Sequence, residues 1–190
     1  YTTLFRSCSE WHLIVNYAKT KVVVFGNRSD DKTFYFNGQV IEKGQEYKYL
    51  GCIFNSCKSG KPFTSNAVYL AGQSLKATFA LKRYTRNLGS LPPKTFLHLF
   101  DSMVTPILEY GCEIWGKHSE IPEIERVHLK FLKSLLGVKQ QTSNLAVYGD
   151  LGRTPLIIRR KLRMLGFCKN LLRTKINSHI RCLKNCSLSI

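Results

Sequence analysis

Aspartate residues, the usual ligands of the metal ions in phosphoryl transfer, are few and scattered along this 190-residue chain. The only adjacent acidic pair is Asp30-Asp31, which lies in a polar, turn-like stretch, whereas Asp101 and Asp150 stand alone. Two-metal catalysis requires carboxylates that converge from separate strands and hold two ions roughly 4 Å apart. We therefore interpret the pair as part of a turn and expect no metal site in this chain.

Cysteine and histidine residues could bind zinc, but their spacing is irregular. The candidate ligand groups are Cys52 with Cys57, and His179 with Cys182 and Cys186. A structural zinc ion takes four ligands, and neither group has a second, well-spaced pair. We interpret the thiols as buried or idle in a reducing compartment. Whether Cys182 and Cys186 begin a truncated zinc knuckle stays open.

Positive charge is the strongest compositional signal in the chain. Lysine and arginine number 29 against 12 acidic residues, which gives a net charge of +17. From Leu151 to Ile190 there are ten basic residues and no acidic one. Such a field attracts polyanions, with nucleic acid the leading candidate and an anionic membrane a distant second, and a merely basic soluble surface is the alternative. No apolar run approaches the length of a membrane span, so we expect no membrane partner.

Hydrophobic periodicity predicts an α+β chain with a boundary near residues 56–62. Runs of β-branched and aromatic residues predict strands at 21–25, 33–36, 39–42 and 47–54, which form a small antiparallel meander. Asn37-Gly38 is typical of a two-residue hairpin turn. Helices are predicted at 64–87, from Pro92 to Trp115 with a kink at Pro106, at 122–136, and from Pro155 onward, with a short turn at 144–148.

The helix that begins at Thr154-Pro155 has an apolar and a basic face. Ile158, Leu162 and Leu165 are predicted to point inward. The residues predicted to face solvent and to bind nucleic acid are Arg159, Arg160 and Arg163.

Four segments resemble, in their order and spacing, the reverse transcriptases of LINE-type (non-LTR) retrotransposons. They are Trp11–Asn16 followed by Lys19–Phe25, then Tyr47-Lys48-Tyr49-Leu50-Gly51, then Pro106–Gly116, and finally Glu125–Lys133 with Leu136–Val138 and Tyr148–Leu156. The resemblance implies the end of a palm domain at 1–26 and a β hairpin, or primer-grip region, at 27–62. It further implies a helical thumb at 63–137 and a basic helical post-thumb segment at 138–190.

The resemblance also implies a function. The chain would be a fragment of an RNA-directed DNA polymerase that grips the primer–template duplex. The fingers and the palm strands that carry the catalytic aspartates would precede Tyr1 in the same polyprotein, so we expect the fragment to be inactive alone. The expected partners are an RNA template and a DNA primer, as an RNA–DNA hybrid. No cofactor is expected in the fragment. The intact polymerase is expected to use Mg²⁺. The expected location is intracellular, in the nucleus and in cytoplasmic ribonucleoprotein.

Individual residues receive roles from the same resemblance. Tyr49, Leu50 and Gly51 would form the primer grip, where a glycine lets the backbone approach a sugar-phosphate; a β-bulge or packing glycine is the alternative. Lys19 would donate a proton to the leaving pyrophosphate as a general acid. Lys21 is a rival for that role, and a solvated loop lysine is the alternative.

Two other functions fit the same residues. One is a domesticated, non-enzymatic nucleic-acid-binding protein that has no polymerase partner. The other is an interaction module whose basic face binds an acidic protein.

Overall fold

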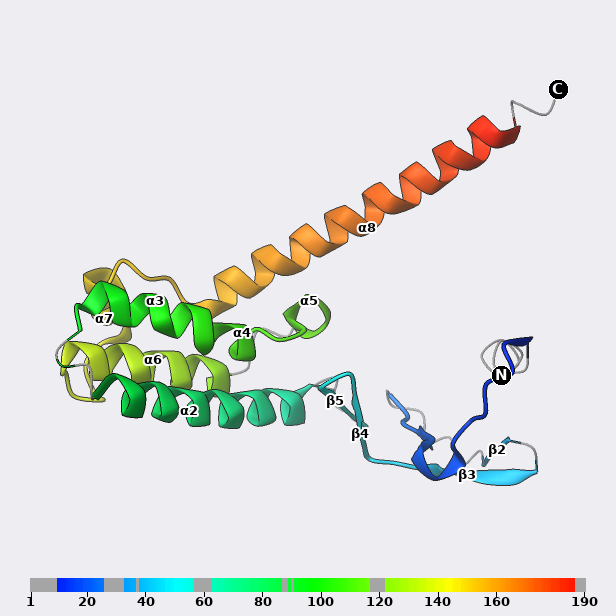
Figure 1. Ribbon diagram of the computed structural model, residues 1–190, viewed down its shortest axis with the longest axis horizontal. Coiled ribbons are helices and arrows are strands. Elements are labelled where there is room, and N and C mark those ends of the chain that lie inside the picture. The colour runs from blue at the N-terminus through cyan, green and yellow to red at the C-terminus, as the bar shows by residue number, and fades with distance from the viewer. Residues whose placement is uncertain are drawn as a thin grey trace. The chain divides into compact units, whose positions relative to one another are not determined.

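The computed structural model describes residues 10–25, 33–36, 38–56, 63–86, 89, 91–116 and 122–186, with side chains in the last helix as far as Thr174. The chain divides into two compact units, Tyr1–Ser65 and Asn66–Ile190 (Figure 1). Small sheets in the first unit and helices in the second confirm the predicted α+β class. Asp30-Asp31, Asn37 and Cys57 lie outside the described residues, as do the side chains of His179, Cys182 and Cys186.

The described residues of the first unit form two separate small sheets. After the short 3-10 helix η1 (Tyr17–Lys19), its strands are β1 (Lys21–Val22), β2 (Phe34–Phe36), β3 (Gln39–Lys43), β4 (Glu46–Tyr49) and β5 (Cys52–Asn55). The first sheet has the order β1-β3-β2, with β2 antiparallel and β1 parallel to β3; the second is the antiparallel hairpin β4-β5. The strands therefore form antiparallel hairpins but no continuous meander. The prediction of one strand at 47–54 is wrong, because the chain reverses after Tyr49.

The second unit is helical. Its elements are α2 (Thr64–Arg86), α3 (Pro93–Met103), α4 (Thr105–Leu108), α5 (Cys112–Trp115), α6 (Pro122–Leu136), α7 (Asn144–Asp150) and α8 (Leu156–Cys186), with the first residues of α2 belonging to the end of the first unit. The helices predicted at 64–87 and 122–136 are confirmed to within a residue. The turn expected at 144–148 is the short helix α7.

The helix predicted from Pro92 to Trp115 is three helices, α3, α4 and α5. The first break follows Met103, where Pro106 cannot donate a backbone hydrogen bond. The second break is at Gly111, which takes a left-handed conformation with φ of 64°. At the end of α5, the Gly116 N–H donates to the Cys112 carbonyl over 2.7 Å. A Cβ atom at Gly116 would lie 2.4 Å from that carbonyl oxygen, so only glycine fits there.

The core of the second unit forms where α3 packs on α6. The Phe100 and Phe131 rings stack with their centroids 4.0 Å apart, and the Phe96 ring also stacks on Phe131, with a centroid distance of 5.9 Å. Other buried apolar residues of the second unit include Leu70, Leu81, Val104, Leu108, Trp115, Ile124, Val127, Leu132, Val147 and Leu156. The core therefore includes residues of α6 and, through Leu156, the first turn of α8. None of the helices described is both long and apolar enough to cross a membrane.

Candidate nucleic-acid interface

Arg160 is buried in the second unit. Its side chain is 1% exposed, and its guanidinium carbon lies 5.2 Å from the centre of a Trp115 ring. Burial lowers the pKa of Arg160, and the negative charge of Glu125 opposes that shift. The prediction that Arg160 faces solvent is therefore wrong. A side chain with almost no exposed surface is also unavailable to a nucleic acid in this arrangement.

Arg159 and Arg163 are half-exposed, but their guanidinium groups pair with acids of the preceding short helices. Arg159 Nε lies 3.2 Å from Glu109 Oε1, and Arg163 donates to Glu109 Oε2 over 2.9 Å. A second nitrogen of Arg163 lies 3.0 Å from Glu113. The Glu109 side chain has no exposed surface, so these pairs neutralise a buried carboxylate. Both arginines would have to give up these partners to contact a phosphate.

The apolar face of α8 is turned away from the core. Ile158, Leu162 and Leu165 are 47%, 63% and 59% exposed, whereas Leu156 is 3% exposed. The prediction that the first three point inward is wrong. Arg160 and Ile158 are two residues apart in the helix and therefore lie on roughly opposite sides of it.

Glu125 of α6 holds the beginning of α8. One carboxylate oxygen of Glu125 accepts a hydrogen bond from the Tyr148 hydroxyl and lies 3.1 Å from His128 Nδ1. The other oxygen accepts a hydrogen bond from the Leu156 N–H over 2.9 Å. Burial would raise the pKa of Glu125, but hydrogen bonds from His128 and Tyr148 outweigh it, and the pKa is lowered. Leu156 is the first residue of α8, so the carboxylate satisfies one of its free N–H groups.

The loop before α8 has a further anchor. Arg153 donates two hydrogen bonds to Asp101 of α3, over 3.1 and 2.7 Å. This bidentate geometry is the strong form of an arginine–carboxylate pair. The segments around 106–116, 125–133 and 148–156 thus meet where α8 joins the other helices, and they contribute structural contacts there.

The β4-β5 hairpin presents the predicted primer-grip residues at its tip. Tyr49 pairs with Cys52 across the hairpin, and Leu50 and Gly51 form the loop between them with φ of 46° and 82°. Positive φ at both positions is typical of a type I′ turn, so Gly51 is a turn glycine and no bulge. Tyr49 and Leu50 are 58% and 74% exposed. A leucine with positive φ costs about 1–2 kcal/mol, and such strain at an exposed residue points to a functional position.

Lys19 and its rival Lys21 have different surroundings. Lys19 ends η1 and is exposed, and its backbone N–H donates to Asn16 Oδ1 over 3.2 Å. Lys21 Nζ lies 3.2 Å from the Glu42 carboxylate, across the parallel β1-β3 pair. Lys21 is therefore engaged in an ion pair, and Lys19 is the more available of the two lysines.

A basic surface missed in the sequence lies on α2, which contains four cationic residues and no acidic one. Lys76, Arg83 and Arg86 are exposed, and the spacing places them on one face of the helix. Phe79 lies on the same face, is 60% exposed, and has Lys130 Nζ of α6 5.9 Å from its ring centre. Cations interleaved with an exposed aromatic ring are typical of surfaces that bind nucleic acids. The seven-residue spacing of Lys76 and Arg83 was the sequence signal.

Like charges gather where α2 meets α6. Lys82 donates to the Ser134 hydroxyl over 2.6 Å, and its pKa is lowered by burial and by repulsion from Lys130. A cluster of repelling cations is stabilised when a polyanion binds to it. We call the exposed residues Lys76, Phe79, Arg83, Arg86 and Lys130 the α2/α6 basic surface.

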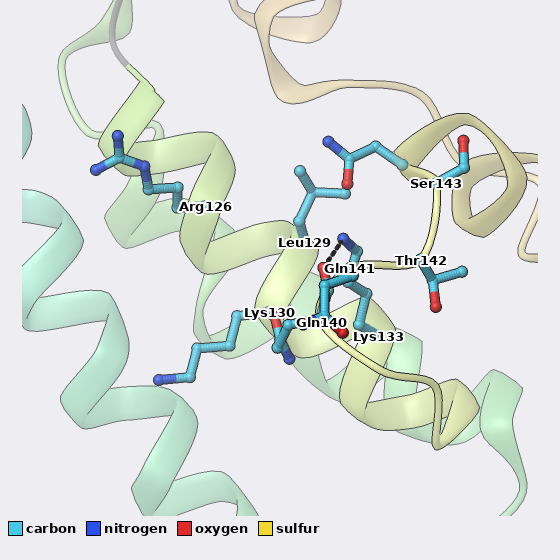
Figure 2. A pocket seen from close by; sticks show the side chains of 9 residues that line it. Arg126, Leu129, Lys130, Lys133, Gln140, Gln141, Thr142 and Ser143 are labelled. Carbon is cyan, nitrogen blue, oxygen red and sulfur yellow. Dashed lines mark hydrogen bonds between the residues drawn. The ribbon is translucent and has the colours of Figure 1, made fainter.

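A pocket adjoins this surface at Lys130 (Figure 2). It has a volume of about 560 Å³ and is lined by Arg126, Leu129, Lys130, Lys133, Gln140, Gln141, Thr142, Ser143 and Asn144. Figure 2 shows the hydrogen bond by which Lys133 Nζ holds the Gln140 carbonyl, 2.7 Å away, and so fixes the loop against α6. The lining combines cations with amide and hydroxyl groups, the donors that bind phosphate oxygens in nucleic-acid complexes.

The described residues provide no group of three or more histidine, cysteine, aspartate or glutamate side chains that could hold a metal ion. Cys52 and Cys112 are buried.

Known proteins give two distant similarities. The chain is 30% identical over 141 residues to an uncharacterised transposon-derived protein of Caenorhabditis elegans, which covers 71% of this chain and 48% of that protein. It is 27% identical over 141 residues to the RNA-directed DNA polymerase from mobile element jockey of Drosophila melanogaster, which covers 72% of this chain and 15% of the polymerase. No family model and no solved structure matches the chain. The chain spans less than half the length of these relatives, and it is distantly related to retrotransposon proteins.

Proposed function

We propose that this chain is part of a non-LTR retrotransposon reverse transcriptase and that it grips the primer–template duplex. The observation that carries the proposal is the similarity to the RNA-directed DNA polymerase from mobile element jockey. Two exposed features support it: the strained Leu50-Gly51 turn and the α2/α6 basic surface. The partners would be an RNA template and a DNA primer, in nuclear and cytoplasmic ribonucleoprotein.

In this proposal the two features contact the sugar–phosphate backbone and read no base. A polymerase must accept every template sequence, so its grip depends on phosphate contacts and duplex shape. Lys76, Arg83 and Lys130 provide exposed cations, and Phe79 provides an apolar ring between them. Lys19 stays the candidate proton donor of the intact polymerase, because Lys21 is paired with Glu42.

Removal of charge from the α2/α6 basic surface tests the proposal. Lys76, Arg83 and Lys130 are replaced together by glutamine, and binding to an RNA–DNA hybrid is measured by fluorescence anisotropy over a range of salt concentrations. If about five cations contact phosphates in the unchanged chain, log K falls with log salt at a slope of about −4. The triple variant should bind more weakly, with a slope shallower by up to about three.

A matched control removes the same charge elsewhere. Lys161, Lys169 and Arg173 of α8 are exposed, and their replacement by glutamine should leave hybrid binding nearly unchanged. Equal weakening by the two triple variants would mean that only the overall charge matters. Tighter binding to one sequence than to scrambled hybrids would contradict a phosphate-based grip.

A domesticated, non-enzymatic nucleic-acid-binding protein is the second candidate. The similarity to a transposon-derived protein of Caenorhabditis elegans favours it. The genomic sequence upstream of Tyr1 separates the two candidates. An open reading frame that continues into a pair of aspartates supports the polymerase, whereas a start codon directly before Tyr1 supports the domesticated protein.

A further inference from the structure

Helix α8 carries an exposed apolar stripe. Ile158, Leu162, Leu165 and Leu172 are 47%, 63%, 59% and 63% exposed. Their spacings of four, three and seven residues match the inner positions of a heptad repeat, which lie along one side of a helix. Lys169 occupies the remaining inner position of this stretch. The stripe thus has the residue pattern of a coiled-coil seam, and its four side chains are exposed in the described part of the chain.

The stripe is distinct from the face that holds α8 in its unit. Leu156 and Arg160 are buried against α5 and α6, while the stripe lies on the other side of the helix. Beyond these first turns α8 continues as one long helix (Figure 1). Its side chains from Leu165 to Thr174 are exposed. Rotation of α8 to bury the stripe would expose Arg160 and break the pairs of Glu109 with Arg159 and Arg163.

Charge decides what kind of helix can cover the stripe. Lys161 and Arg173 are exposed on its two flanks, Lys169 lies within it, and residues 151–190 contain no acidic side chain. A second copy of α8 would bring lysine and arginine opposite lysine and arginine, because flanking positions of coiled-coil helices face each other. Self-pairing is therefore disfavoured, and acidic flanks are favoured in a partner helix.

We propose that the stripe of Ile158, Leu162, Leu165 and Leu172 is the docking face for an amphipathic helix of another protein. The partner's apolar seam is flanked by glutamate or aspartate, and one of its acidic residues faces Lys169. Helix-on-helix docking through anchors at heptad spacing is a common mode of recognition. A nucleic acid is a poorer occupant, because four aliphatic side chains would gain nothing from phosphates. This inference goes beyond the proposed hybrid grip and does not depend on it.

The experiment uses the full chain and a synthetic peptide of about four heptads, with leucine in its seam and glutamate on its flanks. Binding is measured by fluorescence anisotropy, and stoichiometry by analytical ultracentrifugation. We expect a one-to-one complex. Replacement of Leu162 and Leu165 by glutamine should weaken it at least about tenfold, since each residue is an anchor.

Two controls define the face and the charge. Replacement of Phe167 and Leu171 by glutamine changes two exposed apolar residues off the stripe, and should leave the affinity within about twofold. A Lys161→Glu, Lys169→Glu and Arg173→Glu variant should prefer a peptide with lysine on its flanks, because the charge complementarity is then reversed.

Four results would overturn the proposal. They are absence of peptide binding, equal binding of a scrambled peptide of the same composition, self-association of the chain through the stripe, and loss of hybrid binding in the Leu162 and Leu165 variant. The last result would assign the stripe to nucleic acid. Failure of peptide binding with hybrid binding intact would reject this inference and leave the proposed function standing.

Discussion

The burial of Arg160 makes a prediction about stability that opposes the first expectation from the sequence. Arg160→Ala removes a side chain that is 1% exposed and stacked on Trp115. Truncation of a large buried side chain costs roughly 2–5 kcal/mol, and the lost cation–π contact adds about 2 kcal/mol. Arg160 Nε and Nη1 find no hydrogen-bond acceptor among the described residues, and each such group costs about 1–3 kcal/mol when buried. Arg160→Ala also removes these two unpaired donors, and this offsets part of the lost packing. We therefore expect a net destabilisation of about 1–3 kcal/mol.

The balance of these effects can be tested with a second substitution. Arg160→Met keeps most of the packing volume and removes the unpaired donors, so its stability should equal or exceed that of the unchanged chain. Leu162→Ala, on the exposed side of the same helix, should change the free energy of unfolding by less than about 0.5 kcal/mol. Urea unfolding followed by helical circular dichroism measures all three variants, with the denaturant slope as a check on two-state behaviour.

Two outcomes would refute the reasoning. If Leu162→Ala destabilises the chain and Arg160→Ala does not, α8 is held by its leucine face and the burial of Arg160 is wrong. If Arg160→Met is as destabilising as Arg160→Ala, the positive charge stabilises the unit and packing on Trp115 is secondary.

Three further predictions concern other sites. Glu125→Gln should destabilise the second unit by roughly 2–4 kcal/mol at neutral pH, because a carboxylate that accepts several hydrogen bonds is lost. Since folding lowers the pKa of Glu125, its contribution to the free energy of unfolding is present above the unfolded pKa of about 4.3 and is lost as pH falls through the folded pKa. The unfolding curves of the variant and the unchanged chain should therefore converge on acidification. A difference in stability that does not change with pH would contradict this. Leu50→Asn suits a positive φ better and should slow amide hydrogen exchange in β4-β5, yet weaken hybrid binding; unchanged binding would show that the Leu50 side chain makes no contact. The purified chain should make no DNA on a primed RNA template with Mg²⁺, and template-dependent extension above a buffer control would disprove that expectation.

Local sequence signals predicted the helices whose ends are marked by proline, glycine or a change in periodicity. α2 and α6 were predicted nearly to the residue, because a change in periodicity, a proline and a glycine mark their ends. The break of the hairpin after Tyr49 was missed, since Leu50-Gly51 is not a usual turn pair and the alternating residues around it read as one strand.

The orientation of α8 could not be predicted from its own sequence. The stripe at Ile158, Leu162 and Leu165 resembles an ordinary core face, whereas the buried face contains Arg160. The residue that packs on Arg160 is remote in the chain, because Trp115 belongs to α5 and Arg160 to α8. Periodicity predicts that a helix has an apolar side, but it does not show whether that side or a paired, charged side meets the core. For the same reason a nucleic-acid contact was predicted at Arg159, Arg160 and Arg163, and the exposed cations of α2 were missed.

The long sequence separations at Glu109 and Glu125 set an order of assembly during synthesis, when the N-terminal end of a chain emerges first. Glu125 meets Tyr148 and Leu156 only after 23 and 31 further residues have been added, and Glu109 meets Arg163 only after 54. Until then both carboxylates are held in water, because an ionised group is not buried without its partners. The second unit therefore closes from its C-terminal side. A nascent chain stopped ahead of Arg159 would leave Glu109 hydrated and α4 and α5 open around it, and a chain stopped ahead of Tyr148 would leave Glu125 hydrated as well.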